Sequence, residues 1–148
     1  MGSDVMMNRA TGAAHTAHRD QYNAAAADAR RTMTALTAHG GRTARPADPW
    51  VGRQLANLRA ALLSGRGQMC PHIGTAPRVI HAAVWAPGRL VCPGCVSTLT
   101  PDPAEDATCD RCRRTADPIH PTVAQSGPLL LTFGLCGPCL TRTGRAAA

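Results

Sequence analysis

Seven cysteines, arranged in close pairs, limit the folds open to this chain more than any other part of its sequence. Six of them form three Cys-x-x-Cys pairs, and the seventh lies two residues before a histidine. Two cysteines that flank a two-residue turn can place two thiolates on one metal ion, and Pro and Gly in two of the turns favour that path. In chain order, the predicted ligands are Cys70, His72, Cys92, Cys95, Cys109, Cys112, Cys136 and Cys139.

These eight residues are enough for two tetrahedral sites of four ligands each, so we expect two zinc ions per chain. The simplest pairing is sequential, with the first four residues in one site and the last four in the other. A cross-braced arrangement, in which the first and third pairs share a metal, is the alternative. His81 or His120 could replace His72, although such histidines are more often structural. A site filled by four protein ligands has no open position for water, so both metals are expected to be structural.

Metal binding would also compensate for a small number of large apolar residues. Among 148 residues, only 23 are Leu, Ile, Val or Phe, which is too few for a large hydrophobic core. Structural zinc contributes on the order of 10 kcal/mol to the folding of small modules. We therefore expect the metal sites to supply stability that the apolar side chains cannot.

The chain divides into two parts of different composition. Residues 1–12 are predicted to be a disordered tail, followed by a helical region at 13–68 with helices at about 13–39 and 49–63. Residues 69–143 are predicted to form a double zinc-binding module with short strands near 78–85, 89–91 and 129–135. A short tail at 144–148 completes an α+β fold of N-terminal helices followed by strands and knuckles.

The cysteine-rich part of the chain resembles a known structural class. Residues 69–143 resemble zinc-ribbon and treble-clef proteins, in which Cys-x-x-Cys knuckles such as Cys92-Pro93-Gly94-Cys95 hold a structural zinc ion. More loosely, they resemble uncharacterised small cysteine-rich proteins of GC-rich bacteria and their mobile elements. The resemblance implies metal binding and carries no catalytic activity with it.

One enzymatic alternative is an HNH-type nuclease. The order Cys109, Cys112, His120, Cys136 and Cys139 resembles that family, in which His120 would match the general base. The chain departs from the family because Ile119 stands where an acidic residue commonly precedes the base. Residues 140–145 also lack the His or Asn that would complete the metal finger. A degenerate relative without activity fits these departures better.

Two other catalytic readings fit the sequence poorly. Cys136-Gly137-Pro138-Cys139 is similar to the redox centre of thioredoxins, but too few residues follow it to complete that fold. A zinc deaminase needs a His-x-Glu motif, which the sequence lacks. We therefore expect a non-enzymatic protein.

Charge and composition bear on the partner. The formal net charge is +7, and all sixteen basic residues are arginines. We expect an adaptor or regulator that binds a macromolecule, with nucleic acid favoured slightly over protein by the charge. The candidate contacts are Arg111, Arg113, Arg114 and Arg142. The chain shows neither a signal sequence nor a membrane-spanning segment, so a cytoplasmic protein is expected, and its oligomeric state is left open.

Overall fold

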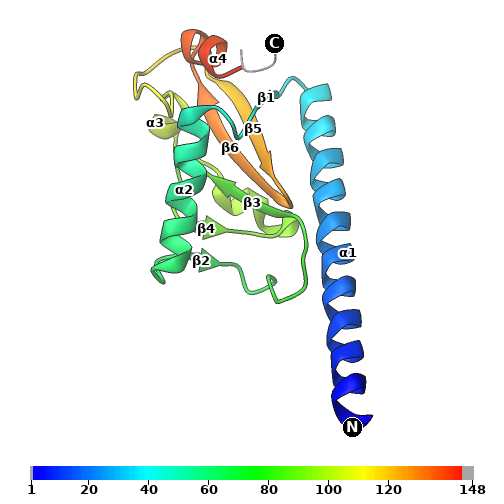
Figure 1. Ribbon diagram of the computed structural model, residues 1–148. Helices are drawn as coiled ribbons and strands as arrows, with labels where there is room; N and C mark the ends of the chain where they lie inside the picture. Colours follow the sequence, from blue (N-terminus) through cyan, green and yellow to red (C-terminus); the bar gives the residue numbers. More distant parts are fainter. Residues whose placement is uncertain (1, 145–148) are drawn as a thin grey trace.

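The computed structural model describes residues 2–144, and the side chains within 11–143 (Figure 1). Helices and short strands alternate along the chain, which confirms the predicted α+β class. The elements are α1 (Gly2–Ala38), β1 (Arg42–Ala44), α2 (Pro49–Leu63), β2 (Gln68–Met69), β3 (Ile80–Ala83), β4 (Arg89–Leu90), the 3₁₀-helix η1 (Pro93–Leu99), α3 (Pro103–Asp106), β5 (His120–Ser126), β6 (Leu129–Leu135) and α4 (Gly137–Gly144).

A four-stranded sheet forms the centre of the fold, with the strand order β1-β5-β6-β3. Strands β5 and β6 form an antiparallel hairpin in which Thr122 lies opposite Phe133. β1 runs parallel to β5, and β3 runs parallel to β6. Strands β2 and β4 form a separate small parallel sheet. The hairpin therefore lies between two strands from earlier in the chain, with β1 on one side and β3 on the other.

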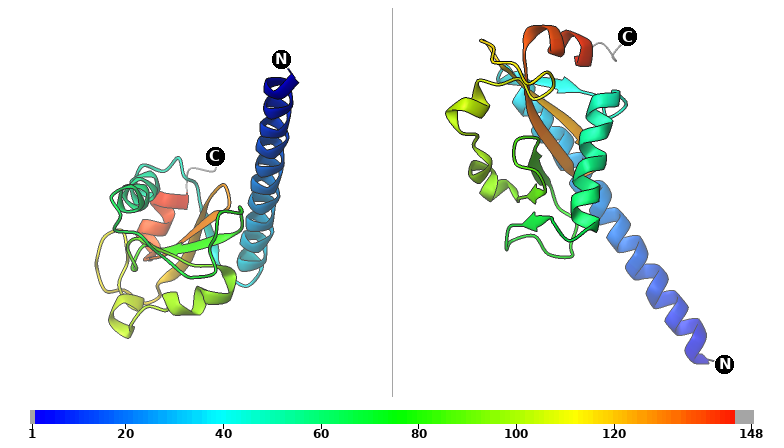
Figure 2. Two further views of the ribbon diagram at one scale, coloured as in Figure 1. Left: turned by 90° about the horizontal axis from the view of Figure 1, so that it is seen from below. Right: turned by 90° about the vertical axis from the view of Figure 1, so that its left-hand side faces the viewer.

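Helix α1 covers one face of the large sheet. Ala29, which is fully buried, packs with Val123 of β5 and Leu130 of β6, and Met33 lies against the same cluster. The small alanine side chain lets the helix approach the strands closely. The N-terminal part of α1 extends past the sheet, and residues 11–24 are exposed (Figures 1 and 2).

Helix α2 covers the opposite face. Its N-cap is Asp48, whose carboxylate accepts hydrogen bonds from the main-chain N–H groups of Trp50 at 2.9 Å and Val51 at 3.1 Å. The Trp50 ring meets Phe133 of β6 edge-to-face, with centroids 5.0 Å apart. Because side chains alternate along β6, Leu131 and Phe133 face α2 while Leu130 faces α1.

Several boundaries differ from those predicted. Helix α1 begins at Gly2 rather than at residue 13, so it includes most of the segment predicted to be disordered. Residues 2–38 contain no proline, and the glycine pair that ends the helix comes only at Gly40 and Gly41, where Gly40 has a φ of 94°. The predicted tail at 144–148 lies outside the described residues, except for Gly144 at the end of α4.

Helix 49–63 and the strand at 129–135 are confirmed to the residue. Strands β1 and β5 were not predicted, because neither contains a run of large apolar side chains. The predicted helical region and zinc module share one core, in which Val51 of α2 packs with Leu131 of β6. Within the described part of the chain, no helix combines the length and the apolar character needed to cross a membrane.

Candidate metal centres

The first cluster lies at the ends of the two strands in the small sheet. β2 ends at Met69 and β4 at Leu90, and these two residues are paired in the parallel register. Cys70 directly follows β2, and Cys92 lies two residues after the end of β4. Both cysteines therefore lie at the same edge of the small sheet. His72 lies in the turn after Cys70, and Cys95 lies in η1.

The four donor atoms of this cluster face one another. His72 Nδ1 lies 3.3 Å from Cys95 Sγ and 3.8 Å from Cys92 Sγ. A zinc ion with bonds of about 2.1 Å to nitrogen and 2.3 Å to sulfur has tetrahedral edges of roughly 3.5 to 3.8 Å. The donor spacing therefore suits a tetrahedral ion of that size, bound by histidine through Nδ1.

The second cluster joins a knuckle to the end of the hairpin. Cys109 and Cys112 lie in the turn that precedes β5, Cys136 follows β6, and Cys139 lies in the first turn of α4. Cys112 Sγ and Cys136 Sγ are 3.8 Å apart, close to the edge of a zinc–thiolate tetrahedron and far longer than a disulfide bond of about 2.05 Å. All seven cysteines are free thiols.

Each cluster places its four donor atoms within 4.8 Å of one another. The arrangement is the sequential one, and the cross-braced alternative is wrong. Among the residues whose side chains are described, these are the two groups of Cys, His, Asp and Glu close enough to share an ion. His81 is buried in β3 and His120 begins β5, and both lie outside the clusters.

The thiols in each cluster differ in acidity. Burial opposes ionisation of Cys70, but main-chain hydrogen bonds from Cys92 and His72 prevail and lower its pKa to about 6. In the second cluster, hydrogen bonds at Cys112 and Cys136 likewise overcome burial and lower the pKa of Cys109 to about 7. Crowded thiols of this kind cannot all ionise together unless a cation lies between them.

Cys136 shows the effect of this crowding. A hydrogen bond from the main chain of Cys139 favours its thiolate, but burial and the neighbouring thiols raise the pKa of Cys136 to about 12. Cys95 in the first cluster also has a raised pKa, caused first by its contact with Cys92. Both sets of donors therefore suit a divalent metal ion that accepts thiolates.

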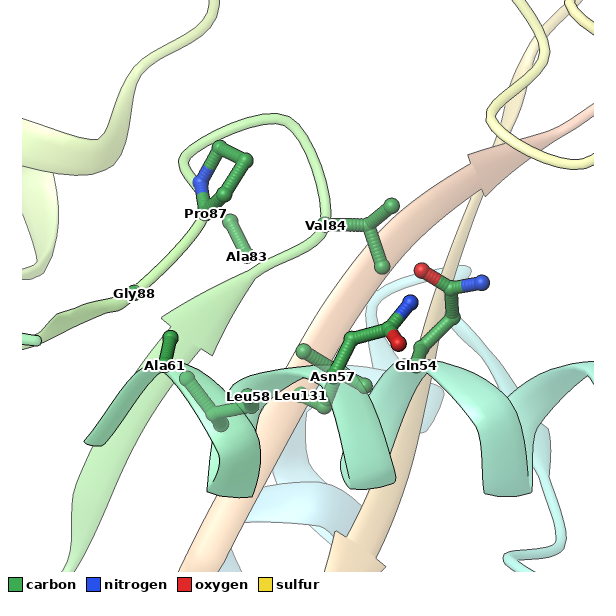
Figure 3. A pocket seen from close by; sticks show the side chains of 9 residues that line it. All are labelled: Gln54, Asn57, Leu58, Ala61, Ala83, Val84, Pro87, Gly88 and Leu131. Atoms are coloured by element: carbon green, nitrogen blue, oxygen red, sulfur yellow. The ribbon is translucent and has the colours of Figure 1, made fainter. Parts of the chain in front are cut away.

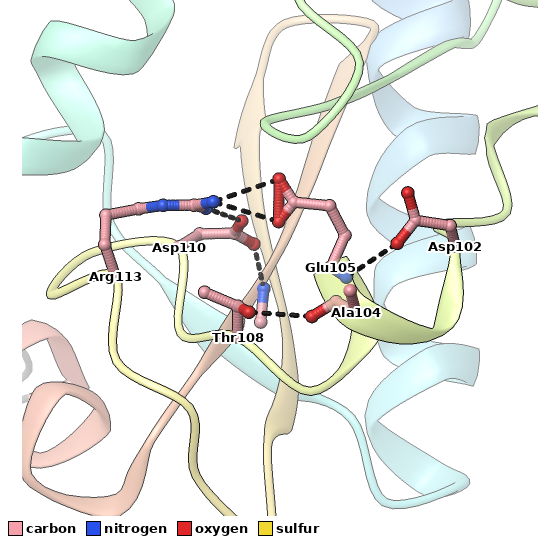
Figure 4. A network of polar contacts seen from close by, with 7 residues as sticks. Asp102, Ala104, Glu105, Thr108, Asp110 and Arg113 are labelled. Carbon is pink, nitrogen blue, oxygen red and sulfur yellow. Dashed lines mark hydrogen bonds and ion pairs between the residues drawn. The ribbon is translucent and has the colours of Figure 1, made fainter.

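A polar network holds the second knuckle against the sheet (Figure 4). The Asp110 carboxylate accepts a hydrogen bond from the Gly134 N–H at 2.7 Å, and the Asp110 N–H donates to the Gly134 carbonyl at 2.9 Å. Arg113, whose φ of 61° places it in the left-handed region, donates to Glu105 at 3.0 and 3.1 Å and to Asp110 at 3.4 Å. The knuckle is thus tied to β6 and to α3.

Arg111 links the same knuckle to two helices. Its guanidinium donates to the hydroxyl of Thr143 in α4 at 2.6 Å and lies 3.5 Å from the carboxylate of Asp48, the N-cap of α2. It also lies over the Trp50 ring, 5.9 Å from the centroid. Arg111 therefore has a structural position that sequence reasoning did not anticipate.

The four arginines proposed from the sequence as nucleic-acid contacts thus differ in availability. Arg111 and Arg113 are paired with carboxylates, and Arg142 donates to Cys139 Sγ at 3.3 Å. Arg114 is exposed and has no polar side-chain partner within the described residues. Three of the four arginines near the second metal centre therefore already contact other groups of the protein.

Comparisons with family models, curated proteins and solved structures gave no match for this chain. The assignment of the two clusters as candidate metal centres therefore depends on their geometry and on the chemistry of their donor atoms.

Proposed function

We propose that this protein is a zinc-stabilised, non-enzymatic module that binds nucleic acid. Zinc is the proposed metal because three thiolates with one imidazole, and four thiolates, are the donor sets typical of structural zinc. The second centre has the order knuckle, hairpin and helix, with ligands on the knuckle and the first helical turn, which supports a treble-clef-like finger. When bound, the two ions would cross-link segments that are far apart in the sequence, residues 70–72 with 92–95 and residues 109–112 with 136–139.

The nucleic-acid part of the proposal rests on one observation, the distribution of charge. Residues 49–101 contain five arginines and no aspartate or glutamate. They include α2, the small sheet and the whole first metal centre, whose three thiolates and one Zn²⁺ would add a charge of only −1. A long segment with uncompensated positive charge is typical of a surface that binds a polyanion.

The arginines of this segment keep their charge available. Arg53 and Arg59 on α2 are exposed and have no polar side-chain partner within the described residues. Arg66, Arg78 and Arg89 donate to neutral oxygens, which leaves their charge unbalanced. Arg78 lines a hollow with Gln21 and Asp28 of α1, on the other side of the sheet from α2. We call the other four residues the arginine set, and they replace the arginines of the second centre as the main candidate contacts.

Salt-dependent binding tests this proposal. Fluorescence anisotropy with labelled single-stranded and duplex DNA is measured between about 50 and 200 mM KCl. The zinc-loaded protein should bind at least one of them, with an affinity that falls steeply with salt. The double variant Arg53→Ala/Arg59→Ala should bind more weakly, and its salt slope should be shallower by roughly 0.7 to 0.9 for each arginine that contacts a phosphate.

A matched control removes the same charge elsewhere. Arg19→Ala/Arg30→Ala changes two exposed arginines on α1, on the other side of the sheet, and should leave most of the affinity and slope intact. Binding that is absent, insensitive to salt, or reduced equally by both double variants would contradict the proposal. Nicking of plasmid DNA with Mg²⁺ that is lost in His120→Ala would contradict the non-enzymatic part.

A further inference from the structure

A small cavity lies between α2 and the turn that follows β3, and the proposed function does not by itself use it (Figure 3). Its volume is about 130 Å³, and it opens to solvent on one side. The floor is aliphatic and includes Leu58 of α2, Leu131 of β6 and Val84. Two carboxamides, those of Gln54 and Asn57, complete its lining on the helix side.

These carboxamides are free to bind a ligand. They lie one turn apart on α2, and neither has a hydrogen-bond partner among the residues the structure describes. A carboxamide offers an N–H donor and a C=O acceptor side by side. Adenine presents the complementary pair, an N6 amino donor and an N7 acceptor, and Asn and Gln are the side chains that pair with it in two-bond contacts.

The size of the cavity limits what can enter it. An aliphatic cavity of about 150 Å³ admits a benzene ring. A cavity of about 130 Å³ that is open on one side therefore admits the edge of one planar base, with the rest of the base outside the cavity, but not a base pair. This favours a base from a single strand over a base inside a duplex.

Charge at both ends of the cavity favours a nucleic acid over an apolar peptide. Arg53 is four residues before Asn57, so it flanks the carboxamides on the exposed side of α2. At the other end, Gly88 lies against the main chain of Arg66, since a side-chain carbon at Gly88 would come within 3.2 Å of the Arg66 carbonyl oxygen. A phosphate on one side of an inserted base would meet the exposed side chain of Arg53, and the loop that carries Arg66 lies at the other end of the cavity.

We infer that the cavity is a base-binding pocket that takes an adenine of a single-stranded nucleic acid, with Gln54 and Asn57 reading its polar edge. This inference rests on the proposed function, because the arginine set would supply the contacts to the strand. It adds a preference for one base that charge alone cannot provide.

Homopolymers of about 12 nucleotides test the inference, because phosphate contacts are then equal and only the bases differ. Anisotropy should show (dA) bound about fivefold or more tightly than (dT) or (dC), as expected for one good two-bond contact. An oligonucleotide with 7-deazaadenine, which lacks the N7 acceptor, should bind about as weakly as (dT).

Three variants test whether the preference for (dA) depends on the cavity. Gln54→Ala/Asn57→Ala should reduce (dA) binding to the level of (dT) while the salt slope stays unchanged. Gln21→Ala/Asn23→Ala, the matched change on the exposed part of α1, should keep the preference. Ala61→Leu, which fills the cavity with a helix-forming side chain, should abolish the preference independently.

The outcomes separate this inference from the proposed function. Equal binding of (dA), (dT) and 7-deaza-(dA), or a preference that survives both Gln54→Ala/Asn57→Ala and Ala61→Leu, would overturn the base pocket. If the binding were still salt-dependent, the proposed function would stand. Absence of binding to every oligonucleotide would remove both.

Discussion

Asp110 and Gly134 exchange hydrogen bonds at 2.7 and 2.9 Å, and this pair ties the knuckle of the second metal centre to strand β6. The two residues lie next to ligands from opposite sides of the centre: Asp110 follows Cys109, and Gly134 lies two residues before Cys136. The pair thus helps to set the distance between the knuckle and the hairpin. The centre is supported by the fold as well as by its ligands.

Loss of the Asp110 carboxylate should therefore destabilise the protein. Asp110→Ala leaves the buried Gly134 N–H without its acceptor, which costs about 1 to 3 kcal/mol of unfolding free energy. Urea denaturation of the metal-loaded protein measures this loss. Asp106→Ala, an exposed change in the neighbouring helix α3, should stay within about 0.5 kcal/mol of the wild type. Equal effects of the two changes would show that the Asp110–Gly134 pair is not a structural link.

Arg111 should matter for stability rather than for nucleic-acid binding. Arg111→Ala leaves the buried carboxylate of Asp48 without its cationic partner and should cost about 1 to 3 kcal/mol. Arg111→Lys should recover only part of this, because an ammonium group cannot reproduce the planar contacts with Thr143 and Trp50. Chemical denaturation measures the loss, and Arg114→Ala in the same loop is the exposed control. A stable Arg111→Ala with a reduced salt slope for DNA would reverse this assignment.

The two metal centres should differ in how easily they lose their ions. His72 is exposed and Cys70 and Cys95 are half-buried, whereas Cys109 and Cys139 are 0% and 2% exposed. Native mass spectrometry should find two zinc ions per chain, and during incubation with EDTA a species with one ion should accumulate. Cys95→Ser should remove the ion that is lost first, and Cys136→Ser the ion that is lost last. Fewer than two ions in the untreated protein would contradict the ligand assignment.

Helix α1 should be an integral part of the fold. Ala29 is 0% exposed against Val123 and Leu130, so Ala29→Leu should overpack this contact and cost about 1 to 3 kcal/mol. Ala24→Leu, at an exposed position of the same helix, is the matched control and should have little effect. Thermal unfolding and limited proteolysis measure both. If Ala29→Leu were neutral, the packing of α1 on the sheet would be wrong.

His81 should make stability depend on pH. Burial lowers its pKa below 6.5, so the unfolded chain binds a proton at a pH where the folded protein does not. The contribution of the buried, neutral His81 to the unfolding free energy is fully present above pH 6.5. It is lost as the pH falls from 6.5 towards the lowered pKa of the folded protein, by at most about 1.4 kcal/mol per pH unit. His81→Gln should flatten this part of the stability profile, and His15→Gln on exposed α1 should not. An unchanged profile in His81→Gln would show that His81 does not titrate on unfolding.

Local features of the sequence determined the candidate ligands and some of the elements. The close cysteine pairs and His72 follow from turn geometry and donor chemistry. Helix α2 follows from its Asp48-Pro49 start and apolar spacing, and β6 from its apolar run. Each of these signals acts within a few residues, so it can be recognised without knowing where the rest of the chain lies.

The tertiary structure alone decided how these parts meet. The sequential pairing of the ligands depends on the β2–β4 register and on the hairpin. Strand β5 depends on its two neighbours more than on its own residues. It also took the packed fold to show that Arg111 is paired with Asp48, whereas Arg53 has no polar side-chain partner among the described residues. The physical reason is that hydrogen-bond and charge partners far apart in the sequence meet only after the chain has folded, and no local pattern records their distance.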